Sequence, residues 1–150
     1  MFNRIHRQLS ALSFAVLLGI VGAGYSAAAQ AETTLYQQLG ERTGVQKIVS
    51  DLIDRAVLDP RIAGKFKDVN KAHLKSSISD QICSISGGPC KYEGPTMKEA
   101  HADMGLRKAD FLALVDDLEQ AMKAQGIPFH VQTKLLALLA PMHRDVVTEH

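Results

Sequence analysis

Aromatic residues are scarce in this chain of 150 residues, cysteines number only two, and neither sign of charge is in excess. Lysine and arginine together number 17 against 16 aspartates and glutamates, so the chain has no basic field to attract nucleic acid. Two cysteines are too few for a disulfide scaffold or for a four-cysteine zinc site. The remaining composition, 46% hydrophobic and 22% charged, is that of one globular domain.

The first 31 residues have the three-part layout of a secretory signal. A basic lead with Arg4 and Arg7 precedes an apolar stretch, which ends in the small-residue motif Ala29-Gln30-Ala31. An uncleaved anchor is the alternative, because the stretch approaches the roughly 20 residues needed to span a membrane. The Ala-x-Ala end favours cleavage, which predicts a periplasmic or secreted mature domain of residues 32–150 without stable membrane insertion.

Export would change the chemistry open to Cys83 and Cys90. In an oxidising compartment the two can pair and close a short loop around Gly87-Gly88-Pro89. Two buried free thiols are the alternative, because pairing also requires a Cα–Cα separation that sequence does not reveal. A disulfide is the expectation for the exported protein.

Apolar residues recur at helical spacing in four stretches of the mature chain, and no stretch shows the alternation of a strand. The stretches cover residues 45–57, 74–85, 111–122 and 131–146. Pro141 falls inside the last of them, where it should kink or restart the helix. The sequence therefore predicts an all-α domain.

The long loop between the second and third stretches contains a short helix candidate at residues 96–104. Thr96, with Glu99 three residues later, forms the capping box typical of a helix start. One face of this helix carries Met97, Ala100, His101 and Met104. The pattern therefore predicts a histidine on an apolar, inward-facing surface.

His101 has two roles that fit this pattern. The commoner one is a core histidine with satisfied hydrogen bonds. The other is a metal ligand whose second ring nitrogen donates to a backbone carbonyl. A lone histidine cannot build a zinc site, but it can supply the strong axial ligand of b-type haem. Covalent c-type haem is excluded, because the chain has no Cys-x-x-Cys-His segment.

An ordered set of short motifs runs along the mature chain. They are Leu35-Tyr36-Gln37-Gln38-Leu39-Gly40, Val57-Leu58-Asp59-Pro60-Arg61-Ile62, Phe66-x-Asp68-Val69, Gly87-Gly88, Lys91-Tyr92-x-Gly94 and Met97-Lys98-Glu99-Ala100-His101. Together they resemble the truncated haemoglobins of group I, over nearly the whole mature chain. The resemblance implies a two-over-two helical sandwich, with helix pairs B–E and G–H, around one noncovalent haem b per chain.

The resemblance assigns roles to the residues that match the family's positions. His101 corresponds to the proximal histidine that binds haem iron. Phe66 corresponds to the phenylalanine that stacks on the haem at the corner after the B and C helices. Tyr92 and Met97 fall where the family lines the proximal and propionate side, and ordinary packing is the alternative role for each.

The distal side departs from the family pattern. Group I members usually place a tyrosine on the B helix and a glutamine on the E helix, whereas this chain has Ile53, Leu74 and Ile78 there. Dioxygen gains negative charge at haem iron, so the loss of a hydrogen-bond donor should weaken its retention. An outward or loop-facing role is favoured for Gln81, and His73 is expected at a propionate or at the surface.

The resemblance implies a monomer that reversibly binds a diatomic gas: oxygen, with nitric oxide and carbon monoxide as further ligands. The enzymatic alternative is nitric oxide oxidation or peroxidase-like turnover, with an unidentified reductase as partner. Such turnover normally uses the distal polar groups that this chain lacks. A further alternative is a non-haem helical interaction module stapled by Cys83 and Cys90. The sequence favours ligand binding over catalysis.

Overall fold

The structure is a computed structural model, and it describes residues 32–149. The predicted signal, residues 1–31, lies outside the described residues. No strand occurs within the described part, where an isolated bridge joins Arg107 and Glu149, and none of its helices could cross a membrane. The elements are α1 (Leu35–Gln38), α2 (Glu41–Ala56), η1 (Ala63–Phe66), α3 (Lys71–Ile85), α4 (Met97–Ala100), α5 (Lys108–Ala124), α6 (Phe129–Leu139), η2 (Ala140–Met142) and α7 (His143–Val146).

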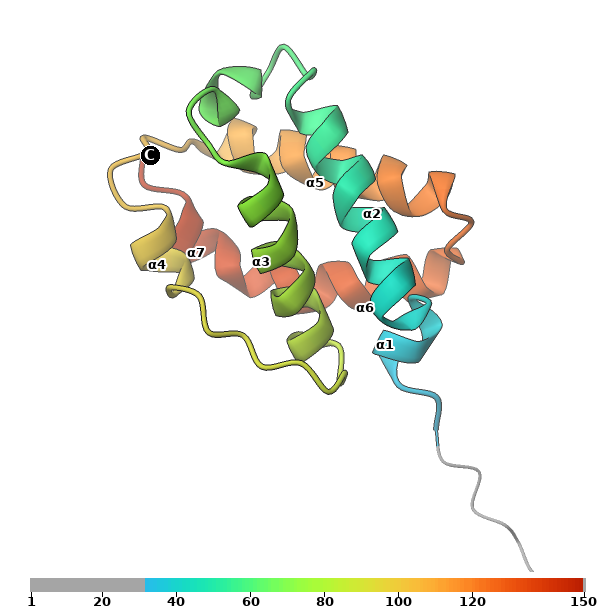
Figure 1. Cartoon of the computed structure of the whole chain (residues 1–150). Coiled ribbons are helices and arrows are strands. Elements are labelled where there is room, and N and C mark those ends of the chain that lie inside the picture. Colours follow the sequence, from blue (N-terminus) through green and yellow to red (C-terminus); the bar gives the residue numbers. More distant parts are fainter. Residues whose placement is uncertain (1–31, 150) are drawn as a thin grey trace, which may run out of the picture. The chain divides into compact units, whose positions relative to one another are not determined.

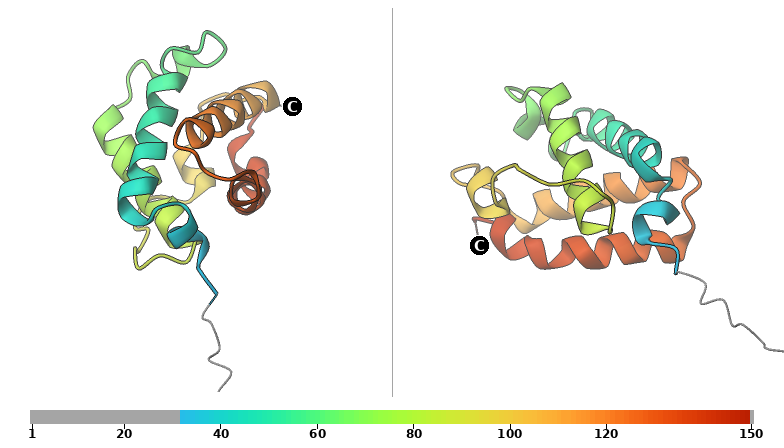
Figure 2. Two further views of the ribbon diagram at one scale, coloured as in Figure 1. Left: turned by 90° about the vertical axis from the view of Figure 1, so that its right-hand side faces the viewer. Right: turned by 60° about the horizontal axis from the view of Figure 1, so that its bottom comes forward.

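The four long helices form two layers (Figures 1 and 2). Helices α2 and α3 run antiparallel in one layer, and α5 and α6 run antiparallel in the other. Helix α2 packs against both α3 and α5, so the core lies between the layers. The largest fully buried side chains of this core include Leu39, Ile48, Ile53, Met122 and Leu135. The expected all-α, two-over-two sandwich is confirmed.

Proline and capping residues place the helix ends where local chemistry predicts them. Helix α6 ends at Leu139, Pro141 lies in η2, and a new helical turn begins at His143, as predicted from the missing N–H of proline. The Thr96–Glu99 capping box at the start of α4 is also confirmed.

Helix α4 is shorter than the residues 96–104 expected from its pattern, because it ends at Ala100. His101 is its C-cap residue, with φ of −115°. Two residues later Asp103 has φ of 60°, and Gly105 has φ of 55°. A right-handed helix cannot pass through such left-handed backbone, so His101 and Met104 lie on a turn and not on one continuous helix face.

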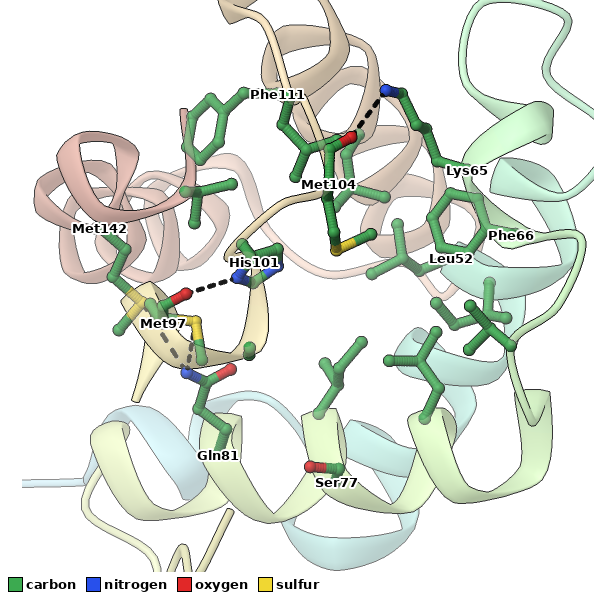
Figure 3. A pocket seen from close by; sticks show the side chains of 18 of the residues that line it. Leu52, Lys65, Phe66, Ser77, Gln81, Met97, His101, Met104, Phe111 and Met142 are labelled. Atoms are coloured by element: carbon green, nitrogen blue, oxygen red, sulfur yellow. Dashed lines mark hydrogen bonds between the residues drawn. The ribbon is translucent and has the colours of Figure 1, made fainter. Parts of the chain in front are cut away.

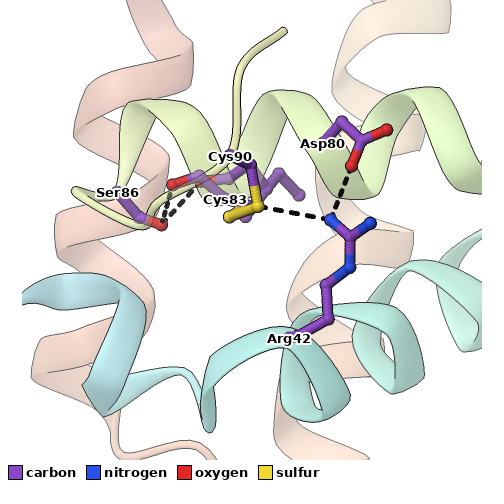
Figure 4. Close-up of a disulfide and its surroundings, with 6 residues drawn as sticks. Arg42, Asp80, Cys83, Ser86 and Cys90 are labelled. Atoms are coloured by element: carbon purple, nitrogen blue, oxygen red, sulfur yellow. Dashed lines mark hydrogen bonds and ion pairs between the residues drawn. A yellow bond between two sulfur atoms is a disulfide. The ribbon is translucent and has the colours of Figure 1, made fainter.

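The chain reverses sharply after α3, at Gly87 and Gly88 (Figure 4). Gly87 has φ of 84°, which glycine adopts without the steric cost of a Cβ. At Gly88 a Cβ would approach Cys83 Sγ to 2.6 Å, so no larger residue fits. The reversal brings the Cα atoms of Cys83 and Cys90 to 5.7 Å and their sulfur atoms to bonding distance.

Candidate functional site

A cavity of about 450 Å³ lies among α3, α4 and α5, and its size is within the range of cofactor sites. Figure 3 shows α3 along one side of it and His101 on the other. Most of its wall is apolar. The residues that the sequence assigned to the site are all part of this wall: Ile53, Phe66, Leu74, Ile78, Tyr92, Met97 and His101. His73 and Gln81, for which other places were favoured, also line it. The tertiary structure therefore assembles one site from segments that are far apart in the chain.

His101 is held by a hydrogen bond within its own turn. Its Nδ1 lies 2.8 Å from the carbonyl oxygen of Met97, and because a carbonyl only accepts, Nδ1 carries the proton and donates. In the neutral ring the other nitrogen, Nε2, then has a lone pair, and none of the hydrogen bonds formed by residues 32–149 involves it. Metal-ligating histidines are oriented in this way, with the second nitrogen donating to a carbonyl.

The described residues offer no other ligands to complete a protein-only metal site. No group of three or more histidine, cysteine, aspartate or glutamate side chains in residues 32–149 could hold a metal ion. A metal bound to Nε2 of His101 would therefore need a cofactor to supply its remaining ligands. The donor set is that of a haem site and not that of a zinc site.

The wall across from His101 comes from α2 and α3 and is almost wholly aliphatic. Ile53 of α2 is fully buried, and Leu74 and Ile78 of α3 are half-buried around the cavity. Ser77, also on α3, adds a hydroxyl to the lining. Sequence inspection missed Ser77, although its spacing of three residues from Leu74 places it near the same helix face.

Gln81 corrects one expectation. The sequence favoured an outward or loop-facing side chain, but Gln81 lines the cavity, two turns along α3 from Leu74. Its Nε2 lies 3.2 Å from the sulfur of Met97 and 3.9 Å from that of Met142 (Figure 3). A spacing of seven residues returns a side chain to the same helix face, which is why Gln81 follows the apolar stripe inward.

The remaining assigned residues line the cavity, and some of them also stabilise the fold by packing or hydrogen bonding. Phe66 ends η1 and packs against both hydrophobic core clusters. Tyr92 donates its hydroxyl to the carbonyl oxygen of Pro95 at 2.9 Å, so this phenol braces the loop before α4. His73 is exposed and lies where the lining meets the surface.

Charged groups at the cavity wall are few. Lys65 and Asp110 are in the lining, and neither was expected from the sequence. Asp110 is buried, and hydrogen bonds from the backbone and side chain of Arg107 hold the pKa of this carboxyl below its ordinary value. Lys65 donates to the backbone carbonyls of Met104 and Gly105. The only signal for Lys65 in the sequence was its place next to Phe66.

Comparisons with known proteins agree on one family. The sequence model described as Bacterial-like globin matches residues 34–148. A group 1 truncated haemoglobin of Synechocystis sp. is 33% identical over 123 residues, which cover 78% of this chain and 99% of that protein. The crystal structure of the Fe(III) truncated haemoglobin from Tetrahymena pyriformis is 25% identical, with a TM-score of 0.74, covering 77% of this chain and 98% of that one.

A more distant structure shares the fold alone. The 2/2 haemoglobin from Synechococcus sp. PCC 7002, described in the cyanomet state with covalently attached haem, is 21% identical with a TM-score of 0.73. It covers 78% of this chain and 100% of its own. The family match over most of the chain, the relative of 33% identity and the shared two-layer fold together make this chain a bacterial-like globin of the group 1 truncated haemoglobins.

Proposed function

We propose that this protein binds haem in the cavity between α3 and α4 and uses it to bind a diatomic gas reversibly. The observation that carries the proposal is the hydrogen bond from Nδ1 of His101 to the Met97 carbonyl, 2.8 Å long, which orients the ring and keeps Nε2 available as a ligand. Haem supplies the iron that takes the gas, since side chains alone offer no such site in residues 32–149.

The residues around the cavity fit a flat apolar cofactor. His101 would hold the iron, while Phe66, Met97 and Tyr92 would contact the macrocycle. The cavity lining contains no cysteine, and the two cysteines of the chain lie beside each other. We therefore propose noncovalent haem b, with one haem per chain, held by the single oriented ligand His101 in this cavity.

The aliphatic wall favours ligand binding over turnover. Ile53, Leu74 and Ile78 exclude water and donate no proton. Dioxygen depends on a distal donor more than carbon monoxide does, because it takes up negative charge when it binds haem iron. We propose that this wall shifts discrimination toward carbon monoxide and nitric oxide, with the hydroxyl of Ser77 and the amide of Gln81 as the polar groups that α3 adds to the lining.

The exposed apolar surface supports a monomer. The large hydrophobic side chains exposed in residues 32–149 are Leu58, which follows α2, Leu112 of α5, and Phe129 and Leu138, which lie near opposite ends of α6. Scattered single residues of this kind are normal on monomeric proteins.

Titration with haemin tests the proposed function. The purified mature chain should develop a Soret band that saturates at one equivalent of haemin. After reduction, carbon monoxide should shift that band, and removal of the gas should reverse the shift. Haemin that keeps the spectrum of its free form in the presence of the protein would contradict haem binding.

We also propose that the protein is exported, cleaved after Ala31, and stabilised by a Cys83–Cys90 disulfide. The Ala-x-Ala motif supports cleavage. The Cα separation of 5.7 Å lies within the range of disulfides, and a bond closing so short a loop is worth about 2–3 kcal/mol of unfolding free energy.

Intact mass spectrometry of protein recovered unreduced from the periplasm or medium tests both statements. The chain should begin at Glu32, and its mass should rise by about 2 Da on reduction, because breaking the disulfide adds two hydrogens. A protein that keeps residues 1–31 and partitions with membranes would support an anchor instead. Two thiols that can be alkylated in unreduced, denatured protein would rule out the disulfide.

A further inference from the structure

The segment that carries His101 contains little regular structure of its own. Helix α4 is only four residues long, and the residues between His101 and α5 pass through left-handed backbone at Asp103 and Gly105. Internal hydrogen bonds are confined to the capping box, the single turn of α4 and the Met104–His101 turn, so contacts with the rest of the protein also fix where His101 lies.

At the N-terminal end of this segment, α4 packs against α7, and the side-chain contact that it receives from α3 is weak. Gln81 of α3 reaches the sulfur of Met97 at 3.2 Å, but a thioether is a poor hydrogen-bond acceptor. The hydrogen bond from His101 to the Met97 carbonyl is internal to the segment. It orients the ring but does not tie the segment to the rest of the protein.

At the C-terminal end, Leu106 is hydrogen-bonded to Thr148 and Glu149, and a charged donor holds the turn between His101 and Leu106. Nζ of Lys65 lies 3.0 Å from the carbonyl oxygen of Met104 and 2.9 Å from that of Gly105. Lys65 belongs to η1, next to Phe66, so these bonds cross from one wall of the cavity to the turn that follows His101; Figure 3 shows the bond to Met104. We refer to the two hydrogen bonds as the Lys65 bridge.

Lys65 suits this role because its ammonium group carries three donors and can serve two carbonyls at once. In residues 32–149 no other donor reaches the carbonyls of Met104 and Gly105. Charged donors form stronger hydrogen bonds than neutral ones, and backbone carbonyls left without a partner in a partly buried site are costly.

We propose that Lys65 is a positioning residue that holds the His101 segment in place and closes the cavity on its cofactor. The inference rests on the proposed haem binding. The new statement is that haem retention depends on Lys65, which lies across the cavity from His101. Lys65 acts through its hydrogen bonds to the backbone carbonyls of Met104 and Gly105.

The test is the rate at which haem-loaded protein loses haem to an excess of apomyoglobin. Lys65→Met, which keeps the length of the side chain and removes its donors, should lose haem about tenfold faster, as expected for a net hydrogen bond to a charged group. Lys65→Arg should restore most of the retention. Lys67→Met is the matched control, since Lys67 is exposed two residues away, and it should behave as wild type.

Two further measurements separate the bridge from other roles of Lys65. In haem-loaded Lys65→Met, amide hydrogen exchange should rise at residues 101–106 and stay unchanged in α2 and α6. The faster loss should persist with haem whose two propionates are methyl esters, because the bridge does not involve the cofactor's carboxylates.

An effect that disappears with the esterified haem would overturn the proposal in favour of a direct ion pair with a propionate. Unchanged haem loss in Lys65→Met, or exchange that rises over the whole protein, would also overturn it. A wild-type chain that takes up no haem would instead contradict the proposed function, so the two failures are distinguishable.

Discussion

Replacement of His101 by alanine is expected to give protein that is colourless or only weakly loaded with haem. The substitution removes the ring nitrogen that the hydrogen bond to Met97 orients in the cavity, and no cluster of three or more histidine, cysteine, aspartate or glutamate side chains in residues 32–149 could take over the metal. Haem affinity should fall by at least about 100-fold, because even partners that merely orient a metal ligand are worth 10–100-fold. Haemin titration followed at the Soret band measures the change.

His130→Ala is the matched control, because His130 is an exposed histidine on α6 that is not part of the cavity lining. It should keep wild-type haem content. Added imidazole should restore a haem spectrum to His101→Gly, since the small ligand can occupy the space left by the ring. A His101→Ala protein with wild-type haem content and spectrum would show that the proximal assignment is wrong.

Replacement of Ile53 by tyrosine is expected to slow oxygen dissociation by about tenfold or more, as one hydrogen bond to a charged acceptor would. Ile53 is fully buried and lines the cavity beside Leu74 and Ile78, so the substitution would place a hydroxyl in a mainly aliphatic part of the wall. Carbon monoxide dissociation should change much less. Flash photolysis and stopped-flow measurements give both rates.

Ile53→Phe controls for the added bulk, because phenylalanine has the ring of tyrosine without its hydroxyl. A slowing that appears in Ile53→Tyr but not in Ile53→Phe assigns the effect to the hydrogen bond. The structure also makes Gln81 a competing donor, since its side chain lines the same cavity. Unaltered oxygen dissociation in Ile53→Tyr, together with faster dissociation in Gln81→Leu, would identify Gln81 as the donor and contradict a purely apolar distal wall.

The helical sandwich follows from local patterns that the chain carries throughout. Apolar residues at helical spacing are buried whichever partner covers them, so the stretches at 45–57 and 111–122 appear as α2 and α5. Pro141 interrupts its helix because its nitrogen has no hydrogen to donate, a property independent of the fold. The C-terminal end of α4 was harder to predict from the sequence. The left-handed backbone that follows it begins at Asp103, and an aspartate does not mark such a conformation as a glycine would.

The main residues of the candidate site could also be predicted from the sequence, because they lie within short contiguous motifs or on regular apolar stripes. His101 lies in the run Met97-Lys98-Glu99-Ala100-His101, and its hydrogen bond to Met97 spans only four residues. The aliphatic positions Ile53, Leu74 and Ile78 lie on the apolar stripes of their helices. Such assignments depend on short-range spacing and on family resemblance.

Contacts between distant segments were decided only by the tertiary structure. Lys65 meets the carbonyl of Met104 across 39 residues of chain, and Gln81 meets the sulfur of Met97 across 16. Nothing in the neighbourhood of a lysine or a glutamine specifies which remote backbone or sulfur atom it will reach. Those distances are set when α3, η1 and the turn that carries His101 pack around one cavity. The position of each segment then depends on all the segments against which it packs.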